Sequence, residues 1–220
     1  MAGDGSSDAD VDSVVPPPAP APTSGADVGS AAQRERRRRI LDATLALASK
    51  GGYDAVQMRT VADKADVAVG TLYRYFPSKV HLLVTALARE LERVEGKVDR
   101  RQLPGDTPVE RLRHVLDMIT FAMQRDPLLT EAMTRAFMFA DASATNEVDR
   151  VATVIDRLLA GAMIDSDDPD ATPTDHDLAV ARVISDVWMS NLVQWLTRRA
   201  SATDVTNRMA MTVQLLLDKN

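Results

Sequence analysis

Cysteine is absent from the 220-residue sequence, and aromatic residues make up only 4% of it. Without cysteine the chain cannot form disulfides, thiolate zinc sites or cysteine nucleophiles, which suits a reducing cytoplasm. A core drawn from the 45% hydrophobic residues must therefore be built mainly from Ala, Val, Leu and Met. No apolar stretch approaches the roughly 20 residues that span a bilayer, and the acidic N-terminus lacks the basic segment of a secretory signal. We expect a soluble, cytoplasmic protein with no membrane partner.

Positive charge is confined to one part of the chain, although the net charge is −6. Residues 1–32 hold five Asp and no Lys or Arg, and residues 102–220 hold eighteen acidic and eleven basic residues. Residues 33–101, by contrast, hold fifteen basic and nine acidic residues. Because salt screens charges beyond about 10 Å at 0.1 M, a phosphate backbone responds to local charge more than to net charge. This distribution favours nucleic acid as the partner of residues 33–101.

Helical patterning runs through the chain from Gln33 onward. Residues 1–32 are acidic and proline-rich with no periodic apolar face, so we expect a disordered tail. After them, start and stop signals stand at Gly51-Gly52, Thr107-Pro108 and Asp126-Pro127. No segment alternates as a strand does. The sequence predicts an all-α protein of nine helices, at about 33–50, 58–65, 69–75, 78–96, from Thr107 to the break at Asp126, from Leu128, 145–163, 175–199 and 203–218.

Two of these helices are short and lie on either side of a tight turn. The segments 58–65 and 69–75 are too brief to bury a face alone, so the first helix must support them. The turn falls near Asp66, a residue type that tolerates left-handed backbone angles. Two helices joined in this way form a helix-turn-helix, whose second helix lies in the major groove, about 12 Å wide. The expected contacts between the two helices are Val61, Ala62, Ala65, Val67 and Leu72.

The run Gly70-Thr71-Leu72-Tyr73-Arg74-Tyr75-Phe76-Pro77-Ser78-Lys79, preceded by Val61-Ala62, closely resembles the hallmark of the TetR family of DNA-binding regulators. The resemblance covers about residues 34–85. It implies a nine-helix fold with a three-helix DNA-binding domain at 33–80 and an effector-binding and dimerisation domain at 81–220. It also implies that Tyr73, Tyr75 and Lys79 contact phosphates, while Gly70 and Thr71 approach the bases. The wider set expected at operator DNA adds Arg59, Thr60, Val69 and Arg74.

A run of five arginines precedes this segment, namely Arg34 and Arg36 to Arg39. We expect Arg34, Arg36, Arg37 and Arg38 to form a basic arm that reaches phosphates or an adjacent minor groove.

Three positions depart from the family pattern. Gln57 and Ala68 stand where a Ser or Thr cap is usual, and His81 replaces a common acidic residue. A missing capping hydroxyl costs about 1 kcal/mol of helix stability and one phosphate contact. The departures weaken the interface without changing its assignment.

The last two helices are apolar on more than one face. The 175–199 helix has apolar residues around most of its circumference, which predicts burial on two sides. One side would pack on the domain core and the other on a second subunit. Together with the 203–218 helix this predicts a four-helix homodimer interface, as the family resemblance also implies, through Val183, Trp195, Val205, Met209 and Val213.

Met and Phe side chains gather in residues 121–139 and are typical of an adaptable apolar cavity. Each of them taken singly is more often an ordinary core residue. The hypothesis is a pocket lined by Phe121, Met133, Phe137, Met138, Trp188 and Leu192.

A narrower resemblance lies in the part of the chain where the family diverges. The runs 126–136, 140–144, 181–188 and 195–205 resemble the actinobacterial members of the family that repress cholesterol catabolism. This resemblance implies that the protein represses sterol-degradation genes and is released by a steroid acyl-CoA thioester. The ligand rests on the resemblance alone, since composition and periodicity say nothing about it.

The sequence shows no motif typical of an enzyme. His81, His114 and His176 lie on separate elements without metal-ligand spacing, and neither a phosphate-binding glycine loop nor a nucleophile motif is present. We therefore expect no catalytic residue, no metal and no cofactor. Two alternatives stay open: a related repressor that senses a drug or a fatty acyl-CoA, and a helical interaction module that no longer binds DNA.

Overall fold

The computed structural model describes residues 25–164 and 171–217, and this part of the chain is helical without any strand. It confirms the all-α fold with nine α-helices in the described residues. Two short 3-10 turns, η1 (Arg100–Gln102) and η2 (Ala142–Ala144), join them. The α-helices are α1 (Gly25–Ala55), α2 (Met58–Ala65), α3 (Val69–Tyr75), α4 (Lys79–Glu95), α5 (Pro108–Gln124), α6 (Pro127–Met138), α7 (Thr145–Met163), α8 (Asp175–Leu196) and α9 (Ala202–Leu217).

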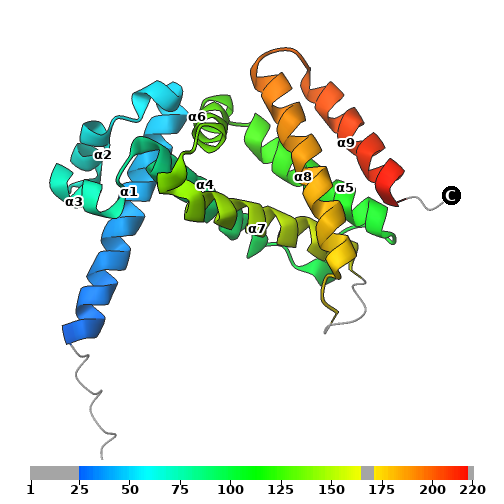
Figure 1. Cartoon of the computed structure of the whole chain (residues 1–220), viewed down its shortest axis with the longest axis horizontal. Helices are drawn as coiled ribbons and strands as arrows, with labels where there is room; N and C mark the ends of the chain where they lie inside the picture. The colour runs from blue at the N-terminus through cyan, green and yellow to red at the C-terminus, as the bar shows by residue number, and fades with distance from the viewer. Residues whose placement is uncertain (1–24, 165–170, 218–220) are drawn as a thin grey trace, which may run out of the picture.

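Helix α1 begins earlier than the sequence predicts. The expected disordered tail ended at residue 32, but residues 25–32 are helical; residues 1–24 lie outside the described part. Ala26, Ala31 and Ala32 have high helix propensity, and the Arg34 guanidinium donates a hydrogen bond to the Ser30 hydroxyl one turn back. As Figure 1 shows, the first turns of α1 extend away from the body of the molecule.

The glycine pair at the other end of α1 interrupts the helix as expected. Gly51 has φ −150° and Gly52 has φ 66° with ψ −160°, so the chain turns sharply before one last helical stretch to Ala55. A positive φ of this kind is open to glycine and costly for other residues. The turn places residues 52–55 against α6, and α1 and α6 are the pair of helices in most extensive contact.

Local capping explains most of the remaining helix boundaries. Thr107 and Glu110 form a reciprocal capping box at the start of α5, with Glu110 N to Thr107 Oγ1 at 3.2 Å and Thr107 N to Glu110 Oε2 at 3.1 Å. The Asp126 carboxylate accepts from Leu129 N at 3.0 Å, which starts α6. Gln57 and Ala68 make no capping bond from their side chains, as expected from their residue types.

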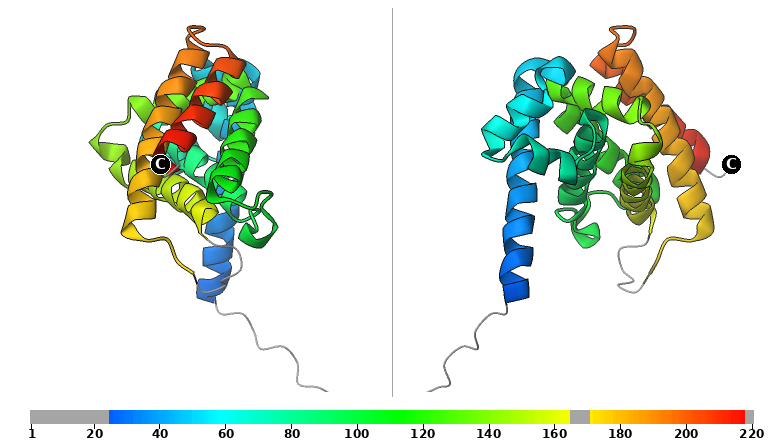
Figure 2. Two further views of the ribbon diagram at one scale, coloured as in Figure 1. Left: turned by 90° about the vertical axis from the view of Figure 1, so that its right-hand side faces the viewer. Right: turned by 60° about the vertical axis from the view of Figure 1, so that its left-hand side comes forward.

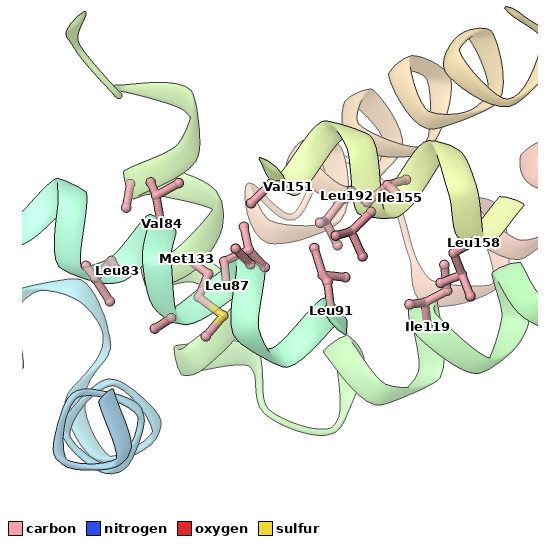
Figure 3. Packing of buried hydrophobic residues seen from close by; sticks show 14 of the residues in the cluster. Leu83, Val84, Leu87, Leu91, Ile119, Met133, Val151, Ile155, Leu158 and Leu192 are labelled. Atoms are coloured by element: carbon pink, nitrogen blue, oxygen red, sulfur yellow. The ribbon is translucent and has the colours of Figure 1, made fainter. Parts of the chain in front are cut away.

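Helix α4 joins the two parts of the molecule. It packs on α1 at one end and on α6 and α7 along its length, and Leu82 to Ala88 are all buried. Figure 3 shows Leu83, Leu87 and Leu91 of α4 in one row of side chains, with Met133 of α6 beside Leu87. Burial of each such leucine contributes roughly 1.5–3 kcal/mol. The hydrophobic core therefore continues from the N-terminal helices into the bundle.

Ion pairs also fix α4 on α7. The Arg150 guanidinium donates two hydrogen bonds of 2.6 Å to the Glu92 carboxylate, and Arg157 donates two of 2.8 and 2.9 Å to Glu95. Hydrogen bonding to Glu92 raises the pKa of Arg150 above its ordinary value. Paired hydrogen bonds of this kind fix the orientation of α4 on α7 as well as their distance.

Helices α8 and α9 lie at the far end of the bundle from α1 to α3, as both Figure 1 and Figure 2 show.

Candidate nucleic-acid interface and effector cavity

Helices α1, α2 and α3 pack together at one end of the molecule, and their buried residues belong to the same continuous core as the bundle. Asp66 adopts a left-handed conformation, φ 52° and ψ 58°, and the chain reverses there with Val67 N donating to Ala62 O at 3.0 Å. The expected contacts between α2 and α3 are present: Val61, Ala62, Ala65 and Leu72 are buried, and Val67 is partly buried. Phe76 is fully buried after α3 and closes this core. The turn and the buried faces fix which side of α3 points outward.

The outward side of α3 holds the residues expected at DNA. Val69, Gly70, Tyr73 and Arg74 are exposed, and the tyrosine is 49% accessible. Thr71 and Tyr75 are partly buried at its margins, and Arg59 and Thr60 are exposed on the neighbouring α2. A Cβ at Gly70 would meet no atom within 4 Å, so this position leaves open space for a partner surface. Helical spacing thus places Val69, Gly70, Tyr73 and Arg74 on one face of α3, opposite the buried Leu72.

The arginines of α1 differ in what they contact. Arg38 is held by carboxylates, at 2.6 Å from Glu35 and 3.1 Å from Asp42, and its pKa is raised by the hydrogen bond to Glu35. The Arg37 guanidinium lies 5.7 Å from the centre of the Phe76 ring. Arg34 is exposed and Arg36 is partly buried. Arg38 must therefore break two ion pairs before it can bind phosphate, whereas the Arg34 guanidinium donates to the Ser30 hydroxyl.

Lys79 opens α4 close to the end of α3. Its ammonium lies 3.7 Å from the centre of the Tyr53 ring. Partial burial lowers the pKa of Lys79, and the positive charge of Arg135 lowers it further, while Asp54 and Glu131 raise it. The predicted phosphate contact is therefore also in contact with α1 and within the field of α6 charges.

A cavity of about 210 Å³ lies between α4, α5 and α6. Its wall is mostly apolar, with Glu90, Asp126 and Thr130 as the polar groups. Typical ligand pockets occupy roughly 300–1,000 Å³, so a large ligand needs these helices to separate. The apolar lining residues are Leu87, Leu91, Val94, Ile119, Ala122, Met123, Leu129 and Met133.

Of the six residues predicted for the pocket, Met133 lines this cavity. Trp188 and Leu192 are in the core, where the Trp188 indole N–H donates to Thr120 Oγ1 at 3.0 Å. Phe137 is partly buried, while Phe121 and Met138 are 64% and 52% exposed. The structure does not bring the six together, because neighbouring residues on one helix point in different directions. Sequence reasoning missed the α4 lining, because leucines spaced four apart fit a core face as well as a cavity wall.

The residues expected at the dimer interface divide in a similar way. Val183 is exposed and Trp195 is partly buried on α8. Val205, Met209 and Val213 are instead buried inside the subunit, because their spacing of four places them on the side of α9 that packs on α5 and α8. The outward side of α9 has Met211 and Leu215, 64% and 76% exposed. The apolar surface of these two helices therefore consists of residues other than those three.

In residues 25–164 and 171–217 no group of three His, Asp or Glu side chains is arranged to hold a metal ion. Across the same residues, no helix has the length and apolar character needed to cross a bilayer.

Both the N-terminal and the C-terminal part of the chain match models of known protein families. Residues 40–86 match the family of bacterial regulatory proteins described as the tetR family, and residues 105–216 match the tetracyclin repressor-like C-terminal domain. A protein named HTH-type transcriptional repressor KstR from Rhodococcus jostii is 69% identical over 191 residues, 87% of each chain. A protein of the same name from Mycobacterium tuberculosis is 62% identical over 192 residues, 87% of this chain and 85% of that one.

Solved structures agree with these matches. A TetR transcriptional regulator from Rhodococcus superposes with a TM-score of 0.72 at 29% identity, over 85% of this chain and 97% of that one. FadR from Bacillus subtilis, in complex with stearoyl-CoA, superposes with a TM-score of 0.57 over 82% of this chain and 97% of that one. At 16% identity, FadR shows the shared fold alone.

Proposed function

This chain belongs to the TetR family as a ligand-responsive transcriptional repressor, and we propose that it binds palindromic operator DNA as a homodimer that a steroid acyl-CoA thioester releases. The proposal includes control of sterol-catabolism genes. The observation that carries the DNA part is the exposed face of α3, with Tyr73 and Arg74 outward on a helix whose inner side is anchored by Leu72. The resemblance of residues 126–144 and 181–205 to sterol repressors carries the effector part.

Operator binding would use two kinds of contact. Tyr73, Tyr75 and Lys79 would bind phosphates, and Gly70 and Thr71 would approach base edges, where sequence is read. In a two-fold dimer the paired α3 helices meet half-sites about 34 Å apart, one turn of DNA. A phosphate contact changes affinity for all sequences, whereas a base contact changes preference.

This division can be tested on a duplex selected by the wild-type protein from a random pool. The variant Lys79→Ala with Tyr73→Phe should weaken binding to every duplex, and Thr71→Ala should shift the selected sequence. An unchanged affinity of the Lys79 and Tyr73 variant at physiological salt refutes this orientation of the helix-turn-helix. Failure of the wild-type protein to select any duplex would favour a helical interaction module instead.

The homodimer would form through α8 and α9. Val183 on α8, with Met211 and Leu215 on α9, supplies large exposed apolar side chains on the two helices that the family pairs across its two-fold axis. An isologous interface of this kind uses the same patch on both subunits. Each substitution at these residues therefore removes contacts at two places in the dimer interface.

The effector would enter the cavity between α4, α5 and α6 and enlarge it. Ala122 lies at the exposed rim of this cavity, and Met133 lies within it. The FadR of Bacillus subtilis was solved in complex with stearoyl-CoA, so a protein of this fold can hold an acyl-CoA. Separation of α4 from α6 would alter the position of α1 to α3, since both helices pack on α1.

A thermal-shift titration tests the effector. A ligand at 100 times its Kd stabilises a protein by about 2.7 kcal/mol, which is roughly 5–11 °C for a chain of this size. We expect this shift with a steroid acyl-CoA and its loss in Ala122→Trp, where the indole blocks the rim. Arg125→Trp, on an exposed neighbour outside the cavity, is the matched control. If Ala122→Trp shows the full shift, the ligand binds elsewhere. If a fatty acyl-CoA shifts the melting temperature and the steroid acyl-CoA does not, the alternative repressor is favoured.

A further inference from the structure

The ring of Tyr53 lies at the meeting point of the two parts of the molecule. Gly52 turns the chain at φ 66°, and Tyr53 follows it directly. The Tyr53 backbone N–H donates to the Glu131 carboxylate of α6 at 3.2 Å. A Cβ on Gly52 would stand 3.2 Å from the same carboxylate, so the turn fits closely against α6. The position of Tyr53 is therefore set by α6.

Two cations lie against this ring. The Lys79 ammonium is 3.7 Å from the ring centre, and the Arg135 guanidinium of α6 is 4.3 Å from it. Cations within about 6 Å of an aromatic face are attracted by its quadrupole. Arg135 also lies 3.7 Å from the Glu131 carboxylate and 3.8 Å from the Asp54 carboxylate, so two acidic groups and the ring together hold its guanidinium.

The charges of α6 also act on the lysine itself. Arg135 lowers the pKa of Lys79 and Glu131 raises it, after the larger effect of partial burial. Both α6 residues thus touch Tyr53 and act on Lys79. Because both cations lie over the face of the ring, the ring is the part of the Tyr53 side chain that links α6 to Lys79.

We propose that Tyr53 is a positioning residue, whose ring holds the Lys79 ammonium for its phosphate contact and makes that contact depend on the place of Glu131 and Arg135 on α6. The inference rests on the proposed role of Lys79 at operator DNA. Tyr53 itself need not touch DNA. When α6 stays docked, the turn at Gly52 and the ring keep the lysine in one orientation. When α6 moves, the ring loses its support and the lysine loses its orientation.

The test is a double-mutant cycle on operator affinity, measured by fluorescence anisotropy with a duplex selected by the wild-type protein. Tyr53→Phe keeps the ring and should bind as the wild type does. Tyr53→Leu should weaken binding about three- to tenfold. It should also reduce the slope of log affinity against log salt by about 0.9 per subunit, the value of one phosphate contact. In a Lys79→Ala background, Tyr53→Leu should have no further effect, because linked residues are not additive.

The link to α6 is tested in the same cycle. Glu131→Ala should weaken operator binding several-fold in the wild-type background and have no effect beside Lys79→Ala. Asp149→Ala, which removes one exposed carboxylate from α7, is the matched control. It should leave operator affinity unchanged in both the wild-type and the Lys79→Ala background. Melting curves of all variants identify any that do not fold. If Tyr53→Leu does not fold, the cycle of Glu131→Ala with Lys79→Ala tests the proposal in its place.

The outcomes separate the two proposals. If Lys79→Ala leaves operator affinity and salt slope unchanged, the phosphate contact itself is wrong. If Lys79→Ala weakens binding and Tyr53→Leu does not, or if the two effects add fully, the positioning role is overturned while the contact stands. If Tyr53→Phe is as weak as Tyr53→Leu, the hydroxyl and not the ring is responsible, and the inference is also overturned.

Discussion

Substitution of Trp188 by Phe should destabilise the protein through one hydrogen bond and one packing defect. The indole is 2% exposed, and its N–H donates to Thr120 Oγ1 at 3.0 Å, joining α8 to α5. Without this donor the buried Thr120 hydroxyl is unsatisfied, at a cost of about 1–3 kcal/mol. The smaller ring leaves a void that adds about 1 kcal/mol. A total near 3 kcal/mol lowers the melting temperature by roughly 6–12 °C.

The companion variant isolates the hydrogen bond. Thr120→Val alone should also destabilise, because it leaves the indole N–H unpaired. Trp188→Phe with Thr120→Val removes both partners, and replacement of both partners by apolar groups is close to neutral apart from the void. Circular dichroism melts of the four proteins measure the coupling. If the double variant is destabilised by the sum of the two single variants, the hydrogen bond does not hold α8 on α5 and the reasoning fails.

Three further predictions concern other parts of the fold. Leu215→Asp with Met211→Asp should give a monomer in sedimentation experiments and weaken operator binding, and a dimer of unchanged affinity would move the interface away from α9. Gly52→Ala should lower the free energy of unfolding by about 1–3 kcal/mol, because alanine is strained at φ 66°; an unchanged denaturation midpoint would mean that the turn relaxes. The backbone N–H groups of Thr107 and Asp106 hold the pKa of Glu110 below its ordinary value of 4.5. The ionised carboxylate therefore stabilises the fold above pH 4.5, and this stabilisation is lost as the pH falls through the lowered pKa of the folded state. Glu110→Gln should make melting temperature less dependent on pH in this acidic range, and an identical pH profile would assign the acid sensitivity to other groups.

Much of the fold could be predicted because its signals are local. The capping box at Thr107, the break at Asp126 and the left-handed turn at Asp66 each depend on residues within four positions. The same holds for the exposed face of α3, since Leu72 fixes the inner side and its neighbours follow from helical spacing. Gly25 as the start of α1 was missed, because acidic and proline-rich composition before it outweighed three alanines.

The effector cavity and the outward face of α9 depend on tertiary packing. Val205, Met209 and Val213 form one apolar stripe, and Met211 with Leu215 forms another on the same helix. Sequence reasoning identified the first stripe and assigned it to the dimer interface, because periodicity alone does not tell which side of a helix packs on its own subunit. The role proposed for Tyr53 is likewise outside sequence reasoning, since residues 53, 79 and 135 meet only in three dimensions.

Release of operator by a steroid acyl-CoA is the measurement that tests the central claim most directly. Complexes of the protein with its selected duplex are titrated with a steroid acyl-CoA, the free steroid acid and a plain fatty acyl-CoA. We predict release at micromolar steroid thioester and little release by the other two. By linkage, operator must weaken thioester binding by the same factor as the thioester weakens operator binding. Equal release by all three ligands, release by none, or thioester affinity that is unchanged by operator would contradict the proposed effector switch.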